Sequence, residues 1–389
     1  MKLVTVILIN LIRSLLFDYK KTTHMTLKKF KRIRYISCKK NDFFIFGKDN
    51  KRVLRDILKD KDFFYYDIYE EGIYFNLTLI ILMLSYLMQT KSIISSYYIA
   101  LVKIKTRKKC VTLIDNSIHY WRIAKALENQ VYTLAIQNGT RLDINLLSDA
   151  RKKEIFHQDY ICFGEFEKVF FNEIGAQVKN FYPYGSIYEK YSKLSETYDI
   201  GTKNEFDICI ISENFSGYDN QYPGVENAVG MIAKYIVKFA KKNNLKVVLA
   251  LKHPVSMKTK NKKELDFYKK YIDISNISIN YKESANPWAS YKVASNSFVT
   301  VGMCSSLLIE IASRGKRIMA CDFYGPPWSL QLPSPLAHIN LSRDYNLFSK
   351  SLKNIFNSTE QQYWNRRSGQ IDYRIGSNSL DEIKQLILK

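Results

Sequence analysis

Through most of the chain, short apolar runs alternate with segments in which apolar residues recur at helical spacing. The runs have the length and the β-branched and aromatic content of buried strands, and they fall at Cys110–Ile114, Tyr132–Ile136, Phe206–Ile211, Lys246–Leu251 and Phe298–Val301. The segments between them, such as Tyr120–Asn129 and Asn227–Asn243, predict amphipathic helices. This alternation of strand and helix predicts an α/β fold with mostly parallel sheets.

One polar stretch interrupts the alternation. Residues 187–205 lack strong periodicity, so we interpret them as a linker between two domains. The sequence therefore predicts a Rossmann-like N-terminal domain over residues 1–190, with a basic, helical N-terminal region, a Rossmann-like C-terminal domain over residues 205–375, and a final helix over residues 376–389. Because ligands bind at the carboxyl edge of open parallel sheets, two such domains predict a ligand site in a cleft that their sheets face.

Three features of the N-terminal region bear on contact with a membrane. Leu3–Phe17 is apolar but short and interrupted, so it predicts either a first strand and helix or an amphipathic surface element. Phe75–Met88 predicts a buried core helix, the first arm of a helical hairpin that continues to Ile104. Lys28–Lys40 contains seven bases and no acid, which fits either a solvated charged face or contact with an anionic inner membrane leaflet.

Composition narrows the classes of partner and of cofactor. The 389-residue chain has a net charge of +22, which favours an anionic partner: nucleic acid, an anionic membrane surface or a phosphorylated substrate. Its six cysteines lack C-x-x-C spacing and several lie in apolar runs, which favours reduced thiols in a cytoplasmic protein over a disulfide framework or a zinc site. Asp60 and Asp62 have D-x-D spacing, but their charged surroundings indicate the surface, so neither a metal nor a cofactor is predicted.

Residues 298–323 predict a strand, a sharp turn, a helix and a second strand. Gly302 permits the turn, and either Ser305 or Ser306 suits the N-cap of the helix. The hydroxyls and free backbone N–H groups at such a helix start attract anions, phosphate above all. An ordinary capped helix with no ligand is the simpler alternative.

A second polar group follows the strand predicted at Lys246–Leu251. Lys252 could neutralise a phosphate there, and Pro254 fixes the direction of the chain so that His253 points over the sheet edge. An imidazole in that position can donate to a phosphate oxygen. A turn histidine without a role is the alternative, but the turn at Gly302 is predicted to lie at the same sheet edge.

This pair of motifs carries a resemblance to a known family. The second half resembles the donor half of GT-B glycosyltransferases that use CMP-activated sugars, namely bacterial sialyltransferases and the Kdo transferases of capsule and lipopolysaccharide assembly, and the match falls on His253-Pro254 and Ser305-Ser306. The first half is similar to surface-polysaccharide proteins through T-L-I-D-N at 112–116 and I-Q-N-G-T-R at 136–141. Asn138 stands where poly-glycerophosphate and capsule polymerases often have histidine, which weighs against a histidine base.

The resemblance implies a GT-B fold and a cytidine monophosphate held by His253, Pro254, Ser305 and Ser306. Physical reasoning adds three residues to this donor-nucleotide site, namely Lys252, Gly302 and Glu310. Glu310 lies about one helical turn beyond Ser306 and could accept hydrogen bonds from ribose hydroxyls, although a surface glutamate is an equal alternative.

Inverting sugar transfer also requires a general base for the acceptor hydroxyl. Asp115, at the end of a predicted strand, is the first candidate, Glu213 is the second, and His119 is a minor alternative beside Asp115. Contacts with the acceptor or the sugar are expected from Asn116, Gln137, Asn138 and Arg141. A guanidinium such as that of Arg141 binds a carboxylate through two parallel hydrogen bonds.

The sequence thus predicts a metal-independent, inverting glycosyltransferase of surface-polysaccharide assembly that uses a CMP-sugar such as Kdo or another nonulosonic acid. Its expected partners are that donor and a glycan or glycolipid acceptor, at the cytoplasmic side and with peripheral contact to the inner membrane. One alternative is a polyol-phosphate transferase with a CDP-glycerol-type donor. A non-enzymatic, basic, membrane-associated assembly factor is another, whereas a nucleic-acid partner lacks any supporting motif.

Overall fold

A computed structural model of the chain describes residues 33–49, 51–68, 73–141, 144, 146–195, 204–213, 215, 218–254, 256–282, 287–325, 330, 332, 337–339, 344–365 and 367–389. The chain divides into two compact units, each described by itself. Unit 1 contains residues 1–136, 154–160 and 177–180, and unit 2 contains residues 137–153, 161–176 and 181–389. The predicted element at Leu3–Phe17 and most of the loop predicted at 323–335 lie outside the described residues.

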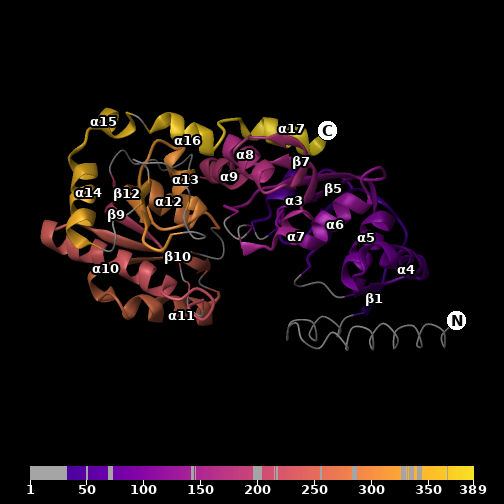
Figure 1. Ribbon diagram of the computed structural model, residues 1–389, viewed down its shortest axis with the longest axis horizontal. Helices are drawn as coiled ribbons and strands as arrows, with labels where there is room; N and C mark the ends of the chain where they lie inside the picture. The colour runs from indigo at the N-terminus through magenta and orange to yellow at the C-terminus, as the bar shows by residue number, and fades with distance from the viewer. Residues whose placement is uncertain are drawn as a thin grey trace. The chain divides into compact units, whose positions relative to one another are not determined.

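A six-stranded sheet in the order β3-β2-β5-β6-β7-β8 lies mainly in unit 1 (Figure 1). Its strands are Asn41–Phe46 (β2), Phe63–Tyr66 (β3), Thr106–Thr112 (β5), Tyr132–Ile136 (β6), Phe156–Ile161 (β7) and Gln177–Tyr182 (β8). β2 pairs in parallel with β3 and β5, and β5 pairs in parallel with β6. The last four residues of β2 are all buried, as expected for a parallel sheet covered on both faces. Val53–Ile57 (α3) and Ile118–Ala126 (α6) are the short helices of this unit.

The predicted helical hairpin is confirmed as Leu77–Thr90 (α4) and Ile93–Lys105 (α5), which pack along each other. The prediction of a buried core helix is wrong for α4. Its residues Leu79, Ile80, Met83 and Tyr86 are buried, but the residues on the opposite side of the helix are exposed. The reason is position, because α4 lies on the outer side of α5, which itself contacts α6 and the sheet (Figure 1).

The second six-stranded sheet forms the centre of unit 2, in the order β11-β10-β9-β12-β13-β14, and every neighbouring pair is parallel. Its strands are Phe206–Ile211 (β9), Val247–Pro254 (β10), Ser278–Lys282 (β11), Ser297–Gly302 (β12), Arg317–Asp322 (β13) and Ala337–Ile339 (β14). The helices of unit 2 are Asp149–Lys152 (α7), Glu165–Glu173 (α8), Ile187–Ser195 (α9), Val225–Asn243 (α10), Lys258–Lys269 (α11), the 3-10 turn Ile274–Asn276, Ala289–Ser295 (α12), Ser306–Ala312 (α13), Tyr345–Asn357 (α14), Glu360–Trp364 (α15), Ser368–Arg374 (α16) and Leu380–Leu388 (α17).

Helices cover both faces of this second sheet (Figure 1). Alternate strand residues such as Ile208 and Leu249 pack against α10, α11 and α14 in one apolar core. α12 and α13 pack against the sheet through β10 and β13. This arrangement confirms the predicted α/β class with parallel sheets, and it leaves the carboxyl ends of the strands as the edge at which polar residues gather.

The interpretation of residues 187–205 as a linker is wrong for its first part, because Ile187–Ser195 forms helix α9. Its buried face is polar: Glu189 is fully buried and accepts a hydrogen bond from Arg314 Nε at 3.3 Å, and Lys193 Nζ lies 2.8 Å from the same carboxylate. Because Glu189 and Ser192 are buried beside Ile187, polar residues occupy much of the buried face and the apolar pattern of α9 is incomplete. Residues 196–203 lie outside the described part of the chain.

Gly164, the N-cap of α8, offers a test of this packing. A Cβ at Gly164 would stand 2.5 Å from the backbone oxygen of Tyr373, so Gly164→Ala forces backbone to move and is expected to lower the free energy of unfolding. We expect a loss of about 1–3 kcal/mol, measured by urea unfolding. Gly369→Ala in α16 is the matched control, because a Cβ added there would meet nothing within 4 Å. Equal effects of the two substitutions would contradict this close approach.

Candidate functional site

The strand order of unit 2 reverses at β9. The chain runs from β9 to β10 and β11, and then returns to place β12 on the other side of β9. In open parallel sheets, ligands bind outside the carboxyl ends of the strands where the order reverses. Ser212 and Glu213 follow β9, and Met303 and Cys304 follow β12, so these residues mark the expected centre of a site.

Glu213 joins the two strand ends. Its carboxylate accepts hydrogen bonds from the N–H groups of Met303 at 2.5 Å and Cys304 at 2.7 Å, and we call this pair of bonds the Glu213 bridge. The Glu213 N–H in turn donates to the Tyr268 hydroxyl at 3.0 Å. Burial raises the pKa of Glu213, and the backbone N–H groups oppose that rise. A Cβ at Gly302 would lie 3.4 Å from Glu213 Oε2, in ordinary van der Waals contact, so the carboxylate packs directly beside this glycine.

Ser305 and Ser306 end the turn that the Glu213 bridge holds. The Ser305 hydroxyl accepts from the Leu307 N–H at 3.3 Å, which confirms one of the two predicted N-cap candidates. Both serines are partly exposed, whereas Met303 and Cys304 are buried and direct their N–H groups at Glu213. The hydroxyls of the two serines are therefore the groups that this turn presents to a ligand.

A loop from the first half of the chain lies against the same turn. Residues 137–141 follow β6 but belong to unit 2. A Cβ at Gly139 would stand 3.8 Å from Ser306 Oγ. The residues of this loop are predicted to contact the acceptor, and Ser306 is predicted to contact the donor. The sequence placed them in separate halves of the chain, and the structure brings them together.

Hydrogen bonds within this loop fix its shape. Gln137 Nε2 donates to the Gly139 carbonyl at 3.0 Å, and Gln137 Oε1 accepts from the Phe163 N–H at 2.7 Å. Arg141 donates to Asn138 Oδ1 at 2.9 Å. Gln137 and Arg141 are buried, whereas Asn138 is partly exposed. Gln137 thus shapes the loop, and among the three predicted residues of this loop Asn138 is the most open.

Lys252 and His253 supply positive charge and an imidazole at the carboxyl end of β10. Lys252 is exposed and His253 is partly exposed. Because β10 lies next to β9 in the parallel sheet, the end of β10 lies at the same edge as the Glu213 bridge. The predicted donor residues Lys252, His253, Ser305 and Ser306 therefore share one edge of one sheet.

Sequence reasoning missed Glu264, which supports this edge from α11. Its carboxylate accepts from the Lys252 N–H at 2.9 Å and from the Ser212 hydroxyl, so it ties the ends of β9 and β10 together. Glu264 is fully buried, and burial raises its pKa. A signal was available, because Glu264, Phe267 and Tyr268 have helical spacing and so place the glutamate on the apolar face of a charged helix.

Glu310 is buried in α13. One of its carboxylate oxygens accepts from the Tyr291 hydroxyl at 2.8 Å, and the other accepts from the Ser186 hydroxyl. These bonds connect α12, α13 and the residue before α9, and burial raises the pKa of Tyr291 well above its ordinary value. The predicted contact with a ribose stays a prediction, and the structure gives both oxygens of Glu310 protein partners.

Asp115 and Asn116 belong to unit 1, shortly after β5. Asp115 is buried, and the Tyr160 hydroxyl donates to its Oδ2 at 2.8 Å. Asn116 is exposed. His119, the alternative neighbour of Asp115, forms a hydrogen bond between its Nδ1 and Ser95 Oγ at 3.0 Å. Asp115 is thus held in a fixed orientation by a neutral donor.

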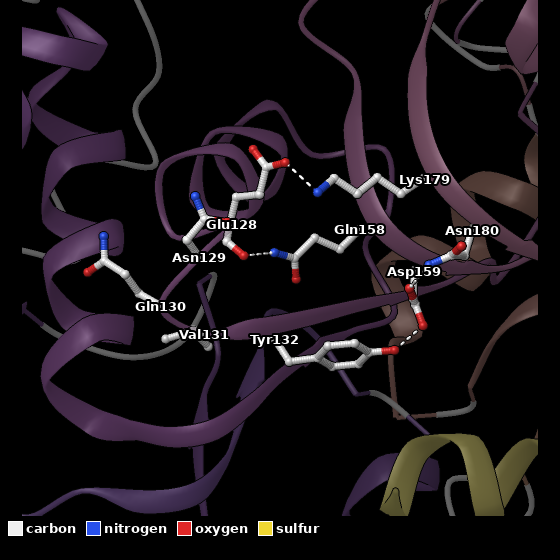
Figure 2. Close-up of a pocket in the computed structure, with 9 residues that line it drawn as sticks. All are labelled: Glu128, Asn129, Gln130, Val131, Tyr132, Gln158, Asp159, Lys179 and Asn180. Atoms are coloured by element: carbon white, nitrogen blue, oxygen red, sulfur yellow. Dashed lines mark hydrogen bonds and ion pairs between the residues drawn. The ribbon is translucent and has the colours of Figure 1, made fainter.

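A hollow of about 400 Å³ lies in unit 1, lined by the turn before β6 and by residues of β7 and β8 (Figure 2). Its polar side chains pair with one another: Lys179 Nζ lies 2.6 Å from Glu128, and Asn180 donates to Asp159 at 2.8 Å. Lys179 lowers the pKa of Glu128. None of the predicted site residues lines this hollow, and its mutual pairing indicates a structural cluster.

The described residues contain neither a candidate metal site nor a candidate membrane-spanning helix. The described part of the chain holds no cluster of three or more histidine, cysteine, aspartate or glutamate side chains placed to bind a metal ion. Within the same residues, every helix is too short or too polar to cross a bilayer.

Comparison with known proteins identifies the fold. No protein-family model and no curated protein sequence matches the chain. Among solved structures, it is similar to a putative UDP-N-acetylglucosamine 2-epimerase from Listeria monocytogenes, with a TM-score of 0.55 and 9% identity over 92% of this chain and 95% of that one. The UDP-GlcNAc 2-epimerase from Methanocaldococcus jannaschii, in complex with UDP-GlcNAc and UDP, gives a TM-score of 0.53 and 12% identity over 92% and 99%.

A variant of the wall teichoic acid polymerase TagF is a third similar structure, with a TM-score of 0.50 and 10% identity over 91% of this chain and 89% of that one. All three similarities extend over most of both chains, so the two sheets of this protein together form a GT-B-type fold. At these identities the similarity defines the fold, and the activity has to be argued from the site.

The pH dependence of stability tests the buried state of Glu264. Its pKa in the folded protein is raised above the ordinary 4.5, so its contribution to stability falls as the pH rises from about 4.5 through the raised value. Glu264→Gln removes this titration. We therefore expect the melting temperature of the variant, relative to the unaltered protein, to increase as the pH rises through that window.

The control for this measurement is Glu173→Gln, which removes an exposed carboxylate from α8. Its melting temperature should follow that of the unaltered protein at every pH. Parallel pH profiles for the Glu264 and Glu173 variants would contradict the raised pKa of Glu264.

Proposed function

We propose that this chain is a metal-independent, inverting glycosyltransferase that uses a CMP-activated sugar, such as Kdo or another nonulosonic acid, in surface-polysaccharide assembly. The observation that carries the proposal is the carboxyl edge of the unit 2 sheet. There Lys252 and His253 end one strand, Ser305 and Ser306 follow another, and the Glu213 bridge fixes the turn that leads to the serines. The GT-B-type fold supports a nucleotide-sugar donor in general.

The chemistry of a CMP leaving group suits these side chains. CMP departs as an anion, so donors and positive charge that are already in place stabilise the transition state. Lys252 supplies charge, His253 supplies a ring N–H, and the hydroxyls of Ser305 and Ser306 supply neutral donors. Glu213 has its carboxylate engaged by two N–H groups, which suits positioning of the turn better than proton transfer.

In the proposed reaction, an acceptor hydroxyl attacks the anomeric carbon while the bond from that carbon to the phosphate oxygen breaks. CMP keeps the electron pair of the broken bond, and the proton of the acceptor passes to Asp115 as general base. The Tyr160 hydroxyl bonded to one Asp115 oxygen orients the carboxylate. Contacts with the acceptor or the sugar carboxylate are assigned to Asn116, Asn138 and Arg141, with Gln137 holding their loop.

The proposed acceptor is a glycan or glycolipid on the cytoplasmic side of the membrane. Peripheral contact with an anionic leaflet would bring the enzyme to a lipid-linked acceptor, in keeping with the net charge of +22.

Nucleotide binding tests the donor site. We expect calorimetry to detect CMP binding, and Lys252→Ala and His253→Ala to weaken it by about 10- to 100-fold each, because each removes a charged or hydrogen-bonded contact with phosphate. Lys246→Ala is the matched control, since Lys246 is exposed at the opposite end of the same strand. Binding of UDP without binding of CMP, or equal losses in the Lys252 and Lys246 variants, would contradict the proposed site.

Loss of turnover tests the base. Asp115→Asn keeps the size of the side chain and an acceptor for the Tyr160 hydroxyl but removes the basic oxygen, so transfer should fall by about 10²- to 10⁴-fold while CMP affinity is unchanged. The measurement is the rate of CMP release in the presence of acceptor. Activity within tenfold of the unaltered enzyme would assign the base to another residue.

The fold similarity with the wall teichoic acid polymerase TagF favours a second candidate reaction at the same edge. A CDP-glycerol-type donor would be attacked at phosphorus instead of carbon, so the product would contain a phosphodiester in place of a glycosidic bond. Asn138, at a position where related polymerases carry histidine, weighs against this candidate. Phosphorus NMR of the purified product distinguishes the two reactions.

A further inference from the structure

One face of α4 is both apolar and exposed. Leu77, Ile81, Leu84 and Met88 are exposed to 65%, 60%, 52% and 84% respectively. Their spacing places them in a single stripe along the helix, opposite the residues that pack toward α5. We call these four residues the α4 stripe.

The α4 stripe contains no charge. The exposed polar residues beside it on the helix, Thr78, Ser85 and Gln89, are uncharged, so a helix of fourteen residues presents an exposed side without a single ionisable group. Water-exposed helices of globular proteins ordinarily place charged residues on that side. A contiguous apolar surface of this kind indicates a site of interaction with a membrane or another protein.

Basic residues lie at both ends of the stripe. At one end, Ile33–Tyr35 (β1) pairs with Ile73–Phe75 (β4), which leads directly into α4, and Asn76 Nδ2 donates to the Ile36 carbonyl at 2.9 Å. The pairing and this bond hold residues 33–36 beside the start of the helix, among them Tyr35, which is 77% exposed. At the other end Lys91 is the C-cap.

The described residues on either side of the stripe in the sequence carry charges of one sign. Residues 33–40 and 73–92 of the described chain include four bases and no acid, and all four bases are exposed: Arg34, Lys39, Lys40 and Lys91. An apolar stripe whose described neighbours along the chain carry only positive charge matches the layers of a bilayer surface, in which acyl chains take up apolar side chains and anionic headgroups attract lysine and arginine. A protein partner would have no charged group on the stripe from which to gain specificity.

We propose that the α4 stripe, with Tyr35 and the bordering bases, docks on the surface of a bilayer that contains anionic lipid. The helix lies in the plane of the surface, with Leu77, Ile81, Leu84 and Met88 among the upper acyl chains. This inference goes beyond the sugar-transfer reaction and does not depend on the identity of the donor.

The test is flotation of the full-length protein with vesicles of phosphatidylcholine alone or with phosphatidylglycerol. We expect binding to the mixed vesicles and at least tenfold weaker binding to phosphatidylcholine. The double variant Ile81→Glu, Leu84→Glu should lose at least tenfold in binding to the mixed vesicles. Leu347→Glu is the matched control, because Leu347 is 45% exposed on α14 in unit 2, and its variant should bind like the unaltered protein.

A second variant distinguishes loss of membrane docking from misfolding of the double variant. Met88→Trp adds a residue that favours the membrane interface, so it should strengthen vesicle binding, an effect that loss of structure would not produce. Equal binding by the double variant and the unaltered protein would overturn the proposal. So would a dimer in the absence of vesicles that the double variant dissociates, because the stripe would then be covered by a second copy.

The vesicle measurement is independent of the proposed reaction. CMP affinity of the double variant should equal that of the unaltered protein, so failure of nucleotide binding and failure of membrane docking are observed separately. Raising the salt concentration should weaken vesicle binding of the unaltered protein, because the cations of the border act through screened charge. Binding that is insensitive to both salt and phosphatidylglycerol would overturn the anionic part of the proposal.

Discussion

The buried carboxylate of Glu213 is the interaction on which the candidate site depends. A carboxylate taken out of water needs strong hydrogen-bond donors, and the chain provides two consecutive N–H groups after β12. The stabilisation is mutual, because the N–H groups of the turn bind the carboxylate and the carboxylate fixes the conformation of the turn. Tyr268 completes the arrangement by accepting the Glu213 N–H.

The same solution recurs in unit 2. Glu264 ties the ends of β9 and β10, and Glu310 ties α12 and α13, each through a buried carboxylate that accepts from hydroxyl or N–H groups. Burial raises the pKa of Glu213 and of Glu264, so folding and protonation are coupled at these positions. Hydrogen bonds with defined directions therefore fix the positions of the strand ends at the sheet edge. Apolar packing alone would allow these ends to shift slightly.

The sequence alone was sufficient to predict the elements whose apolar residues follow a regular pattern. β6 and β9 begin and end at the predicted residues, because each carries an apolar pattern that local physics determines. It was insufficient where a partner lies far along the chain. The polar face of α9 is explained only by Arg314, and the exposure of α4 only by its place outside α5. In the site, the residue types at the strand ends were predictable, whereas the Glu213 bridge and the support from Glu264 required the tertiary structure.

The end of the chain contributes to the start of α8. The Gly376 N–H donates to the Phe163 carbonyl at 2.6 Å, and the backbone of Tyr373 lies against Gly164. During synthesis, α8 and the loop at 137–141 emerge long before the residues that enclose them in unit 2. Unit 2 can therefore reach its final packing only after residues 373–376 have left the ribosome, so its assembly depends on contacts between segments that lie far apart along the chain.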